Sequence, residues 1–154
     1  MRVLLQRVSR AQVTIDGDLS GRIGAGLVAL VGVHGNDGLR DAHFCADKSA
    51  HLRIFADDEG RFDRSLLEVA GQVLAVSQFT LYGECRKGRR PFFGEAADPA
   101  VAEPLYVAYM DRLRQEHGLT VACGVFGAHM DLEIHNDGPV TLVIDSPASP
   151  TVDR

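Results

Sequence analysis

Apolar and polar residues alternate from the first residues of the chain. Val3, Leu5, Val8, Val13 and Ile15 carry the apolar series, and their neighbours are mostly polar. A period of two is typical of a strand with one buried face. An Asp-Gly-Asp cluster at 16–18 then provides residues that favour a turn. The chain is therefore predicted to open with a β-hairpin.

Two later stretches are apolar without alternation. Residues 27–33 form a β-rich run bounded by Gly24, Gly26 and Gly35, and residues 73–81 form a second one. Continuous runs of this length are typical of strands buried on both faces, so 27–33 is predicted to be a central strand. Closing strands are expected at 121–123, 132–134 and 140–144, with the Asp-Gly-Pro turn at 137–139 interrupting the last two.

Two segments show helical spacing. Apolar groups recur at helical intervals over roughly 38–52, where Asp37 is positioned to cap the start. A second amphipathic pattern begins at Asp98-Pro99, with proline in the first turn, and ends at His117-Gly118. Strands with two main helices, joined mostly by short turns, predict an α+β fold built on antiparallel β-sheets. We expect one domain over 1–145 and a flexible C-terminal tail over 146–154.

Composition describes an ordinary globular protein. The chain has 154 residues, of which 45% are hydrophobic and 24% charged, enough apolar surface for a real core. Cys45, Cys85 and Cys123 are odd in number and widely spaced, which fits a reducing compartment. Arg2 and Arg7 interrupt the N-terminus too early for a signal peptide, and no apolar run approaches the ~20 residues of a membrane span. A cytoplasmic location is expected.

Charge separates one short segment from the rest. The net charge of −5 argues against nonspecific nucleic-acid binding, which depends on cations that neutralise phosphates. However, Arg86, Lys87, Arg89 and Arg90 lie within five consecutive residues. Such a cluster can hold a phosphate backbone locally, although a solvated loop is the simpler interpretation.

Two motifs place polar chemistry inside β-rich sequence. Ser77, Gln78 and Thr80 follow the apolar part of the 73–81 run, and strand ends commonly carry sites. If the extended geometry persists, Gln78 and Thr80 share one face, while Ser77 and Phe79 share the other. The second motif, 136–141, reads Asn-Asp-Gly-Pro-Val-Thr and must be a bulge, an edge or a loop, because proline cannot donate to a sheet ladder. Polar strand-end residues and a plain turn remain the alternatives.

Together these motifs resemble the D-aminoacyl-tRNA deacylase family. The matching segments fall in the order and spacing of that family over residues 1 to about 145. They are Gln6-Arg7-Val8, Gly24-Ala25-Gly26-Leu27, Arg53-Ile54-Phe55, Ser77-Gln78-Phe79-Thr80-Leu81, Arg89-Arg90-Pro91 and Asn136-Asp137-Gly138-Pro139-Val140-Thr141. The resemblance implies a barrel-like core and hydrolysis of the ester between a D-amino acid and tRNA, and it implies no cofactor.

The resemblance also implies a composite site in a homodimer. In the family the Gly-Pro motif, here Gly138 and Pro139, has a cis bond and inserts into the pocket of the partner subunit, with Arg7 fixing its geometry. Its carbonyls would face the α-amino group of the substrate, and an L side chain would collide with the backbone. Selection would then work by rejecting L substrates, and achiral glycine on tRNA would be accepted.

For the reaction itself, the resemblance points to Ser77, Gln78, Phe79 and Thr80. Backbone N–H groups, expected at Phe79 and Thr80, would form an oxyanion hole, and the 2′-hydroxyl of the tRNA would assist. A Thr80 nucleophile is the alternative, but it needs a general base. No base lies close in sequence, although the fold could bring His129, His135 or Asp137 near.

Further residues take roles from the same resemblance. Phe126 and Met130 match the pocket wall that packs on the terminal adenosine, although the sequence alone favours core positions for both. The cluster Arg86, Lys87, Arg89 and Arg90 becomes a contact for the tRNA backbone. Phe92 departs from the family, in which many members have a small polar residue after the proline, and Gly83-Glu84-Cys85 also differs.

Two other classes remain as alternatives. No metal is expected, because His129, His135 and Cys123 match no zinc spacing. A noncatalytic RNA-binding or dimerisation module would keep the fold without turnover. A general Ser- or Thr-dependent esterase would hydrolyse small esters and lose all activity as Thr80→Ala.

Overall fold

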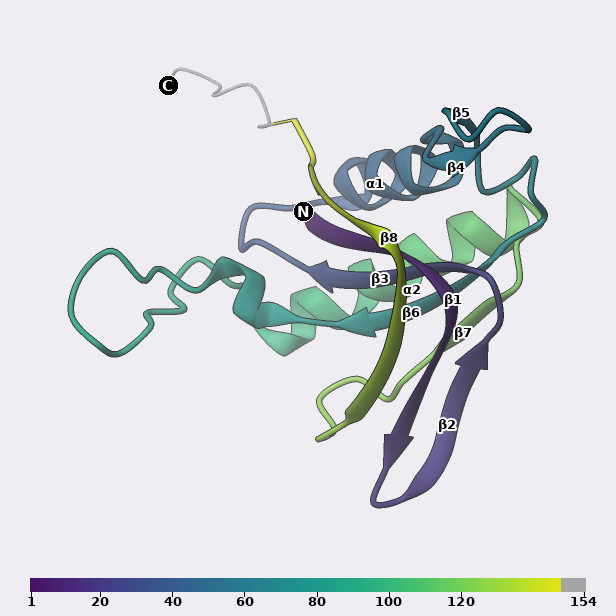
Figure 1. Cartoon of the computed structure of the whole chain (residues 1–154). Helices are drawn as coiled ribbons and strands as arrows, with labels where there is room; N and C mark the ends of the chain where they lie inside the picture. The colour runs from purple at the N-terminus through teal and green to yellow at the C-terminus, as the bar shows by residue number, and fades with distance from the viewer. Residues whose placement is uncertain (148–154) are drawn as a thin grey trace.

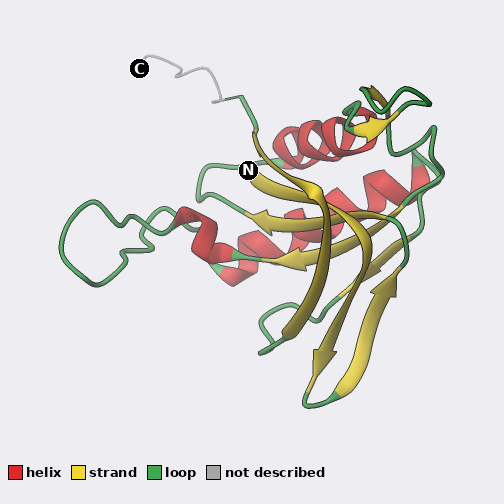
Figure 2. Cartoon of the chain, in the orientation of Figure 1, coloured by secondary structure: helices red, strands yellow, loops and turns green. Residues whose placement is uncertain are grey.

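The computed structural model describes residues 1–147 and has an α+β architecture (Figures 1 and 2). Its elements follow in the order β1 (Arg2–Ile15), β2 (Asp18–Ile23), β3 (Gly26–Gly32), α1 (Leu39–His51), β4 (Phe55–Ala56), β5 (Phe62–Arg64), β6 (Gln72–Ser77), the 3-10 helix η1 (Phe79–Tyr82), α2 (Pro99–Gln115), β7 (Val121–Cys123) and β8 (Asp131–Asp145). The predicted fold class, with two main helices, is confirmed. Of the tail predicted over 146–154, residues 148–154 lie outside the described part.

Strand β1 organises the sheet because it pairs with three others. Its first half pairs antiparallel with β3, its second half with β2, and nearly its whole length with β8. The order continues from β3 through β6 to β7, and these last two pairings are parallel. The sheet is thus mixed, where the sequence pattern predicted antiparallel sheets. The Ser20 hydroxyl donates to the Cys123 carbonyl at 3.3 Å, so β2 and β7 approach and the sheet nearly closes.

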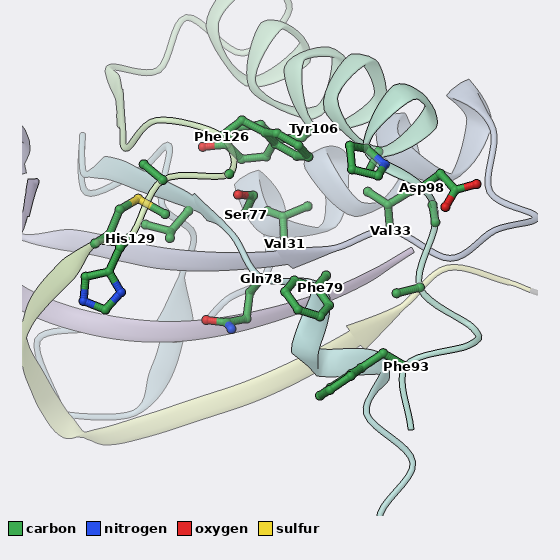
Figure 3. A pocket seen from close by; sticks show the side chains of 18 of the residues that line it. Val31, Val33, Ser77, Gln78, Phe79, Phe93, Asp98, Tyr106, Phe126 and His129 are labelled. Carbon is green, nitrogen blue, oxygen red and sulfur yellow. The ribbon is translucent and has the colours of Figure 1, made fainter. Parts of the chain in front are cut away.

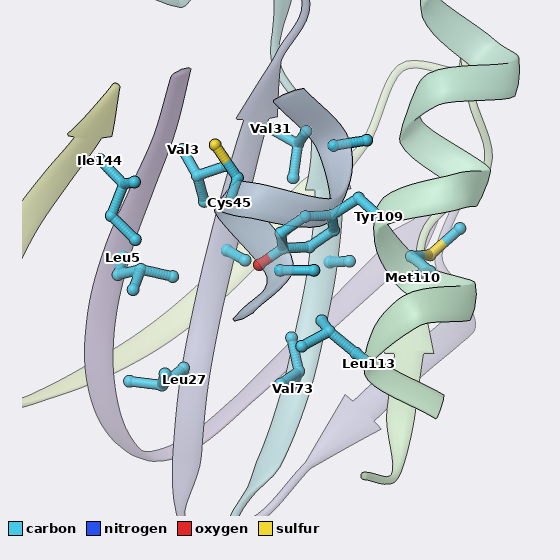
Figure 4. Close-up of a cluster of buried hydrophobic side chains, with 14 of the residues drawn as sticks. Val3, Leu5, Leu27, Val31, Cys45, Val73, Tyr109, Met110, Leu113 and Ile144 are labelled. Carbon is cyan, nitrogen blue, oxygen red and sulfur yellow. The ribbon is translucent and has the colours of Figure 1, made fainter. Parts of the chain in front are cut away.

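The central strands are buried on both faces, as their continuous apolar runs predicted. In β3, Leu27 and Val31 belong to the larger core and Val28 to the smaller one. Both helices lie on the same side of the sheet (Figure 1). There Cys45 of α1 and Tyr109 of α2 meet the strands in the larger core (Figure 4). The smaller core fills the opposite, concave side.

Several local predictions were wrong. The strands expected at 132–134 and 140–144 form one strand, β8. Asp37 does not cap α1: the N-cap is Gly38, and the Asp37 carboxylate instead binds the ammonium of Met1. The carboxylate of Asp41 accepts the Gly38 amide at 2.9 Å, which completes the helix start from inside. The run 73–81 is also not one strand, because β6 ends at Ser77 and η1 follows.

Candidate active site

A cavity of about 620 Å³ opens where β6 ends (Figure 3). Its walls come from β3, the β6–η1 junction, the start of α2 and the segment between β7 and β8. The lining residues are Val31, Val33, Val76, Ser77, Gln78, Phe79, Phe93, Ala96, Ala97, Asp98, Pro99, Ala102, Tyr106, Phe126, Gly127, Ala128, His129, Met130 and Leu132. Three of the four residues predicted for catalysis line it, together with both predicted wall residues, Phe126 and Met130.

The β6–η1 junction leaves two backbone donors unpaired. The Gln78 amide still continues the ladder, donating to the Val31 carbonyl at 2.8 Å, and the chain then turns into η1. Within residues 1–147, neither the Phe79 nor the Thr80 amide donates to a protein group. The first amides of a helix lack intrahelical partners, so this turn explains why both are available.

The side chains at this junction do not supply a base. Gln78 Nε2 donates to the Thr80 hydroxyl. Within the described residues the hydroxyl makes no other hydrogen bond. Thr80 is exposed and does not line the cavity. The prediction that Gln78 and Thr80 share one strand face, with Ser77 and Phe79 on the other, is wrong because the chain turns into η1 at Phe79. Phe79 packs edge-on against Phe93, with ring centroids 5.2 Å apart.

Tyr106 and Phe126 form an aromatic wall of the cavity. The ring of Phe126 lies 6.1 Å from that of Tyr106, centroid to centroid. The Tyr106 hydroxyl donates to the Ala75 carbonyl at 2.8 Å, and burial raises the pKa of this phenol well above its ordinary value. Tyr106 therefore stays a neutral, fixed wall of the cavity. Met130 is partly buried against the smaller core and lines the same cavity.

Of the three groups considered as bases, only His129 lines the cavity among the described residues. His135 Nε2 instead contacts a Glu133 carboxylate oxygen at 2.7 Å on β8. Asp137 lies beside Arg7, with 3.3 Å between its Oδ2 and Arg7 Nε. No interaction within residues 1–147 connects His129 with the Thr80 hydroxyl.

The Gly138-Pro139 motif lies on a bulge of β8. Gln6 pairs with Thr141, but the next pair is Val8 with Asn136, so residues 137–140 stand opposite Arg7 alone. The Gly138-Pro139 bond is cis, and Gly138 has a φ of +128°. Both residues are exposed, and neither lines the cavity of its own chain.

Arg7 and Asn136 fix the bulge from either end. Arg7 Nε donates to the Asp137 carbonyl at 3.1 Å and its Nη1 to the Ile54 carbonyl at 2.7 Å, while only 12% of the side chain is exposed. The Asn136 side chain accepts the Val140 amide at 3.1 Å and donates to the Thr141 hydroxyl at 3.0 Å. The bulge is therefore a defined, outward-facing feature of the chain.

The basic cluster occupies a loop that projects beyond the sheet after η1 (Figure 1). Arg86 pairs with Glu84, and this contact lowers the pKa of Glu84 to about 2. Lys87, Arg89 and Arg90 are exposed and form no salt bridge within residues 1–147. Three cations are thus available to a ligand.

Several cavity residues were not identified from the sequence. Tyr106 carries the apolar pattern of α2, which indicates only a core position. Asp98 was interpreted only as a helix start, and Phe93 carries no motif. Their contribution depends on how α2 and the loop before it cross the end of β6. Between residues 1 and 147 no helix is long and apolar enough to span a membrane, and no cluster of three or more metal-ligating side chains occurs.

Comparison with known proteins gives concordant matches. The family model described as D-Tyr-tRNA(Tyr) deacylase matches residues 4–145. A D-aminoacyl-tRNA deacylase of Geobacillus sp. (strain WCH70) is 56% identical over 146 residues, 95% of each chain. One of Thermus aquaticus is 55% identical over 150 residues, covering 97% of this chain and 98% of its own.

Solved structures give the same fold. The structure of a protein named c-Myc DNA Unwinding Element Binding Protein aligns with a TM-score of 0.90 at 36% identity, covering 96% of this chain and all of its own. The structure of a probable eukaryotic D-amino acid tRNA deacylase aligns with a TM-score of 0.81 at 20% identity, covering 94% of this chain and 98% of its own. At that lower identity the likeness concerns the fold alone.

Proposed function

The chain belongs to the D-Tyr-tRNA(Tyr) deacylase family and is a D-aminoacyl-tRNA deacylase, an ester hydrolase, and on this basis we propose how its residues divide the work. One subunit supplies the cavity and the backbone donors at the end of β6. A second copy supplies the Gly138-Pro139 bulge. The observation that carries this division is that the bulge is exposed and ordered but lies outside the cavity of its own chain.

The unpaired amides of Phe79 and Thr80 are the proposed oxyanion hole. Attack of water on the ester carbonyl moves negative charge onto the carbonyl oxygen, which these two donors stabilise. Each donor contributes about 2.7–4 kcal/mol in comparable acyl-transfer sites. The bond that breaks joins the acyl carbon to the ribose oxygen, so the products are free D-amino acid and tRNA. The neighbouring 2′-hydroxyl of the ribose assists proton transfer to the leaving oxygen.

Thr80 is assigned to positioning rather than attack. A hydroxyl nucleophile needs a base within hydrogen-bond reach, and the Thr80 hydroxyl instead accepts from the Gln78 amide, which is not a base. Gln78 and Ser77 line the cavity and orient the substrate. Phe126 and Met130 pack against the terminal adenosine, on the wall that Tyr106 supports.

Chiral selection is assigned to the partner's bulge. The carbonyls of Gly138 and Pro139 would bind the α-amino group, and an L side chain would then point into the backbone. Arg7 keeps the bulge in shape through the Asp137 carbonyl. A glycyl ester has no side chain to collide, so glycyl-tRNA is expected to be a substrate. The site is therefore completed only in a homodimer.

The projecting basic loop is the proposed contact for the tRNA backbone. Lys87, Arg89 and Arg90 are free to bind phosphates, and Arg86 is held by Glu84. Such contacts position a nucleic acid without reading its sequence. Since charged tRNA is used in translation, we place the enzyme in the cytoplasm.

The test is single-turnover deacylation of matched D-Tyr-tRNA and L-Tyr-tRNA, with EDTA present. Rapid loss of the D ester, with the L ester spared, is the expected result. Cleavage of both esters would refute the assignment of chiral selection to Gly138 and Pro139. Persistence of both at the uncatalysed rate would favour a noncatalytic nucleic-acid-binding protein, the role that the name of the solved relative at 36% identity suggests.

A further inference from the structure

The loop between η1 and α2 presents an aromatic ring beside its free cations. Phe92 is 68% exposed, the largest exposed fraction among the large hydrophobic side chains of the described residues. A Phe side chain that stays in water does not contribute the about 1.5–3 kcal/mol of stability that its burial would provide. Together with the exposed cations of the same loop, this ring is accessible to a ligand.

The backbone of Phe92 is held in place by hydrogen bonds. The Glu84 amide donates to the Phe92 carbonyl at 2.8 Å, and the Phe92 amide returns the bond at 3.0 Å. This pair closes the loop at its base, so that Arg86 to Arg90 form its tip. Gly94 supports one side of the ring: a Cβ atom there would lie 2.3 Å from a ring carbon of Phe92. Only glycine permits this approach.

Phe93, the residue after Phe92, connects the loop to the cavity. Phe93 lines the cavity and packs against Phe79, which carries one of the unpaired amides. Consecutive Cα atoms are about 3.8 Å apart, so the Cα atom of Phe92 lies that far from the Cα atom of a residue that lines the cavity. Along the loop, Phe92 therefore lies between Phe93, which lines the cavity, and the tip that carries Lys87, Arg89 and Arg90.

We propose that Phe92 stacks on an unpaired nucleobase of the 3′ end of tRNA, next to the terminal adenosine in the cavity. Exposed aromatic rings combined with free cations are the usual means of binding single-stranded nucleic acid, because every base offers a π-face. The phosphates on either side of the stacked base would meet the cations of the loop tip. The proposal rests on the proposed function for its ligand, and it adds a substrate-binding residue.

The experiment measures binding of uncharged tRNA by fluorescence anisotropy, so turnover is not required. Wild type, Phe92→Ala, Phe92→Trp and Phe92→Leu are each titrated with full-length tRNA and with tRNA that lacks its three 3′-terminal nucleotides. Leu39→Ala is the control, because Leu39 is 55% exposed on α1. Thermal melting checks that each variant folds.

Stacking predicts that Phe92→Ala weakens binding of full-length tRNA by about 5- to 150-fold, the range for loss of one stacked base. Trp should restore the affinity and Leu should not, because only Trp keeps a π-face. With the shortened tRNA, wild type and Phe92→Ala should bind equally. Gly94→Ala, which displaces the ring without removing it, should weaken binding in the same direction.

The proposal is overturned if Phe92→Ala weakens binding of both tRNAs by the same factor, or if Leu replaces Phe without loss. It is also overturned if wild type does not distinguish the two tRNAs. Failure of the proposed function looks different, because an inactive protein that shows the binding pattern above would refute deacylation and leave stacking in place.

Discussion

The cavity at the end of β6 and the bulge on β8 contain the two halves of the family's signature, yet they differ in almost every physical respect. The cavity is recessed and its walls are largely apolar and aromatic. The bulge is exposed, and it is held by polar contacts to Arg7 and Asn136. The cavity has the shape of a binding pocket, and the bulge has the shape of a segment that inserts into a pocket. The proposed composite site assigns the cavity to one subunit and the bulge to its partner.

The largest expected effect comes from removing an oxyanion donor on the cavity side. Phe79→Pro and Phe79→Ala both lose the ring, but only Pro also loses the N–H. Gln78 has φ −145° and ψ 79°, which is outside the helical region that a following proline disfavours. Phe79→Pro should reduce kcat by about 10²- to 10³-fold relative to Phe79→Ala. Equal rates for the two variants in single-turnover deacylation would remove Phe79 N–H from the mechanism.

The Thr80 hydroxyl provides a second test of the cavity side. Thr80→Ala should reduce kcat by only about fivefold, the equivalent of one ordinary hydrogen bond. A nucleophile would lose nearly all activity instead. Measured kcat for D-Tyr-tRNA decides between the two, and hydrolysis of small esters by wild type checks the general esterase alternative.

On the bulge side, Gly138→Ala should reduce kcat/KM by about 10²-fold, since misplacement of a substrate-binding group by about 1 Å has that effect. Gly138 has a positive φ, and an added Cβ would lie 2.9 Å from Val140 Cγ2 and 3.1 Å from Arg7 Nη2. Gly17→Ala is the control, because Gly17 also has a positive φ but has no atom within 4 Å of an added Cβ. Equal activity of the two variants would contradict the role of the bulge.

A smaller effect is expected from Arg7. Arg7→Ala removes hydrogen bonds to the Asp137 and Ile54 carbonyls, and bonds of a charged donor contribute about 1.5–3 kcal/mol. We expect kcat/KM to fall by about tenfold or more, with L-Tyr-tRNA discriminated less strongly. Arg10→Ala serves as the control, because the Arg10 side chain is 67% exposed. If both variants discriminate D from L equally well, Arg7 does not position the motif.

The smallest effect is expected in the basic loop, which belongs to neither part. The double variant Arg89→Ala, Arg90→Ala should raise KM for tRNA a few-fold. The slope of log affinity against log salt should fall by about 0.7–0.9 for each phosphate that is no longer bound. Arg40→Ala, an exposed arginine on α1, should change neither quantity. An unchanged salt dependence in the double variant would show that the loop does not bind phosphates.

The two regions also differ in how far the sequence predicted them. The hairpin and the two helices follow from periodicity, because each buries a face that the pattern marks, and the central strand follows from its continuous apolar run. The segments Ser77 to Thr80 and Gly138-Pro139 were identified from motifs. The end of β6 at Ser77 was not predicted, because an apolar run does not mark where a chain turns into a 3-10 helix.

Contacts between segments that are distant in sequence explain the remaining differences between the predictions and the structure. Asp37 is adjacent to α1 in sequence, but the Met1 ammonium, brought close by β1, takes its carboxylate instead. The parallel pairing of β3 with β6 depends on the crossover through α1, which local patterns do not specify. Tyr106 lines the cavity because α2 crosses the end of β6, and its helical spacing alone indicates only a buried position.

Whether two subunits share each site is decided by deacylation with a heterodimer purified through two different tags. One subunit carries Phe79→Pro and the other Gly138→Ala, so one of the two sites would combine an intact cavity with an intact bulge. A shared site predicts that the heterodimer regains about half of the wild-type rate, as two-fold symmetry requires, while both parent variants remain nearly inactive. A heterodimer no more active than the mean of its parents would contradict sharing, because each chain would then use its own Gly138-Pro139.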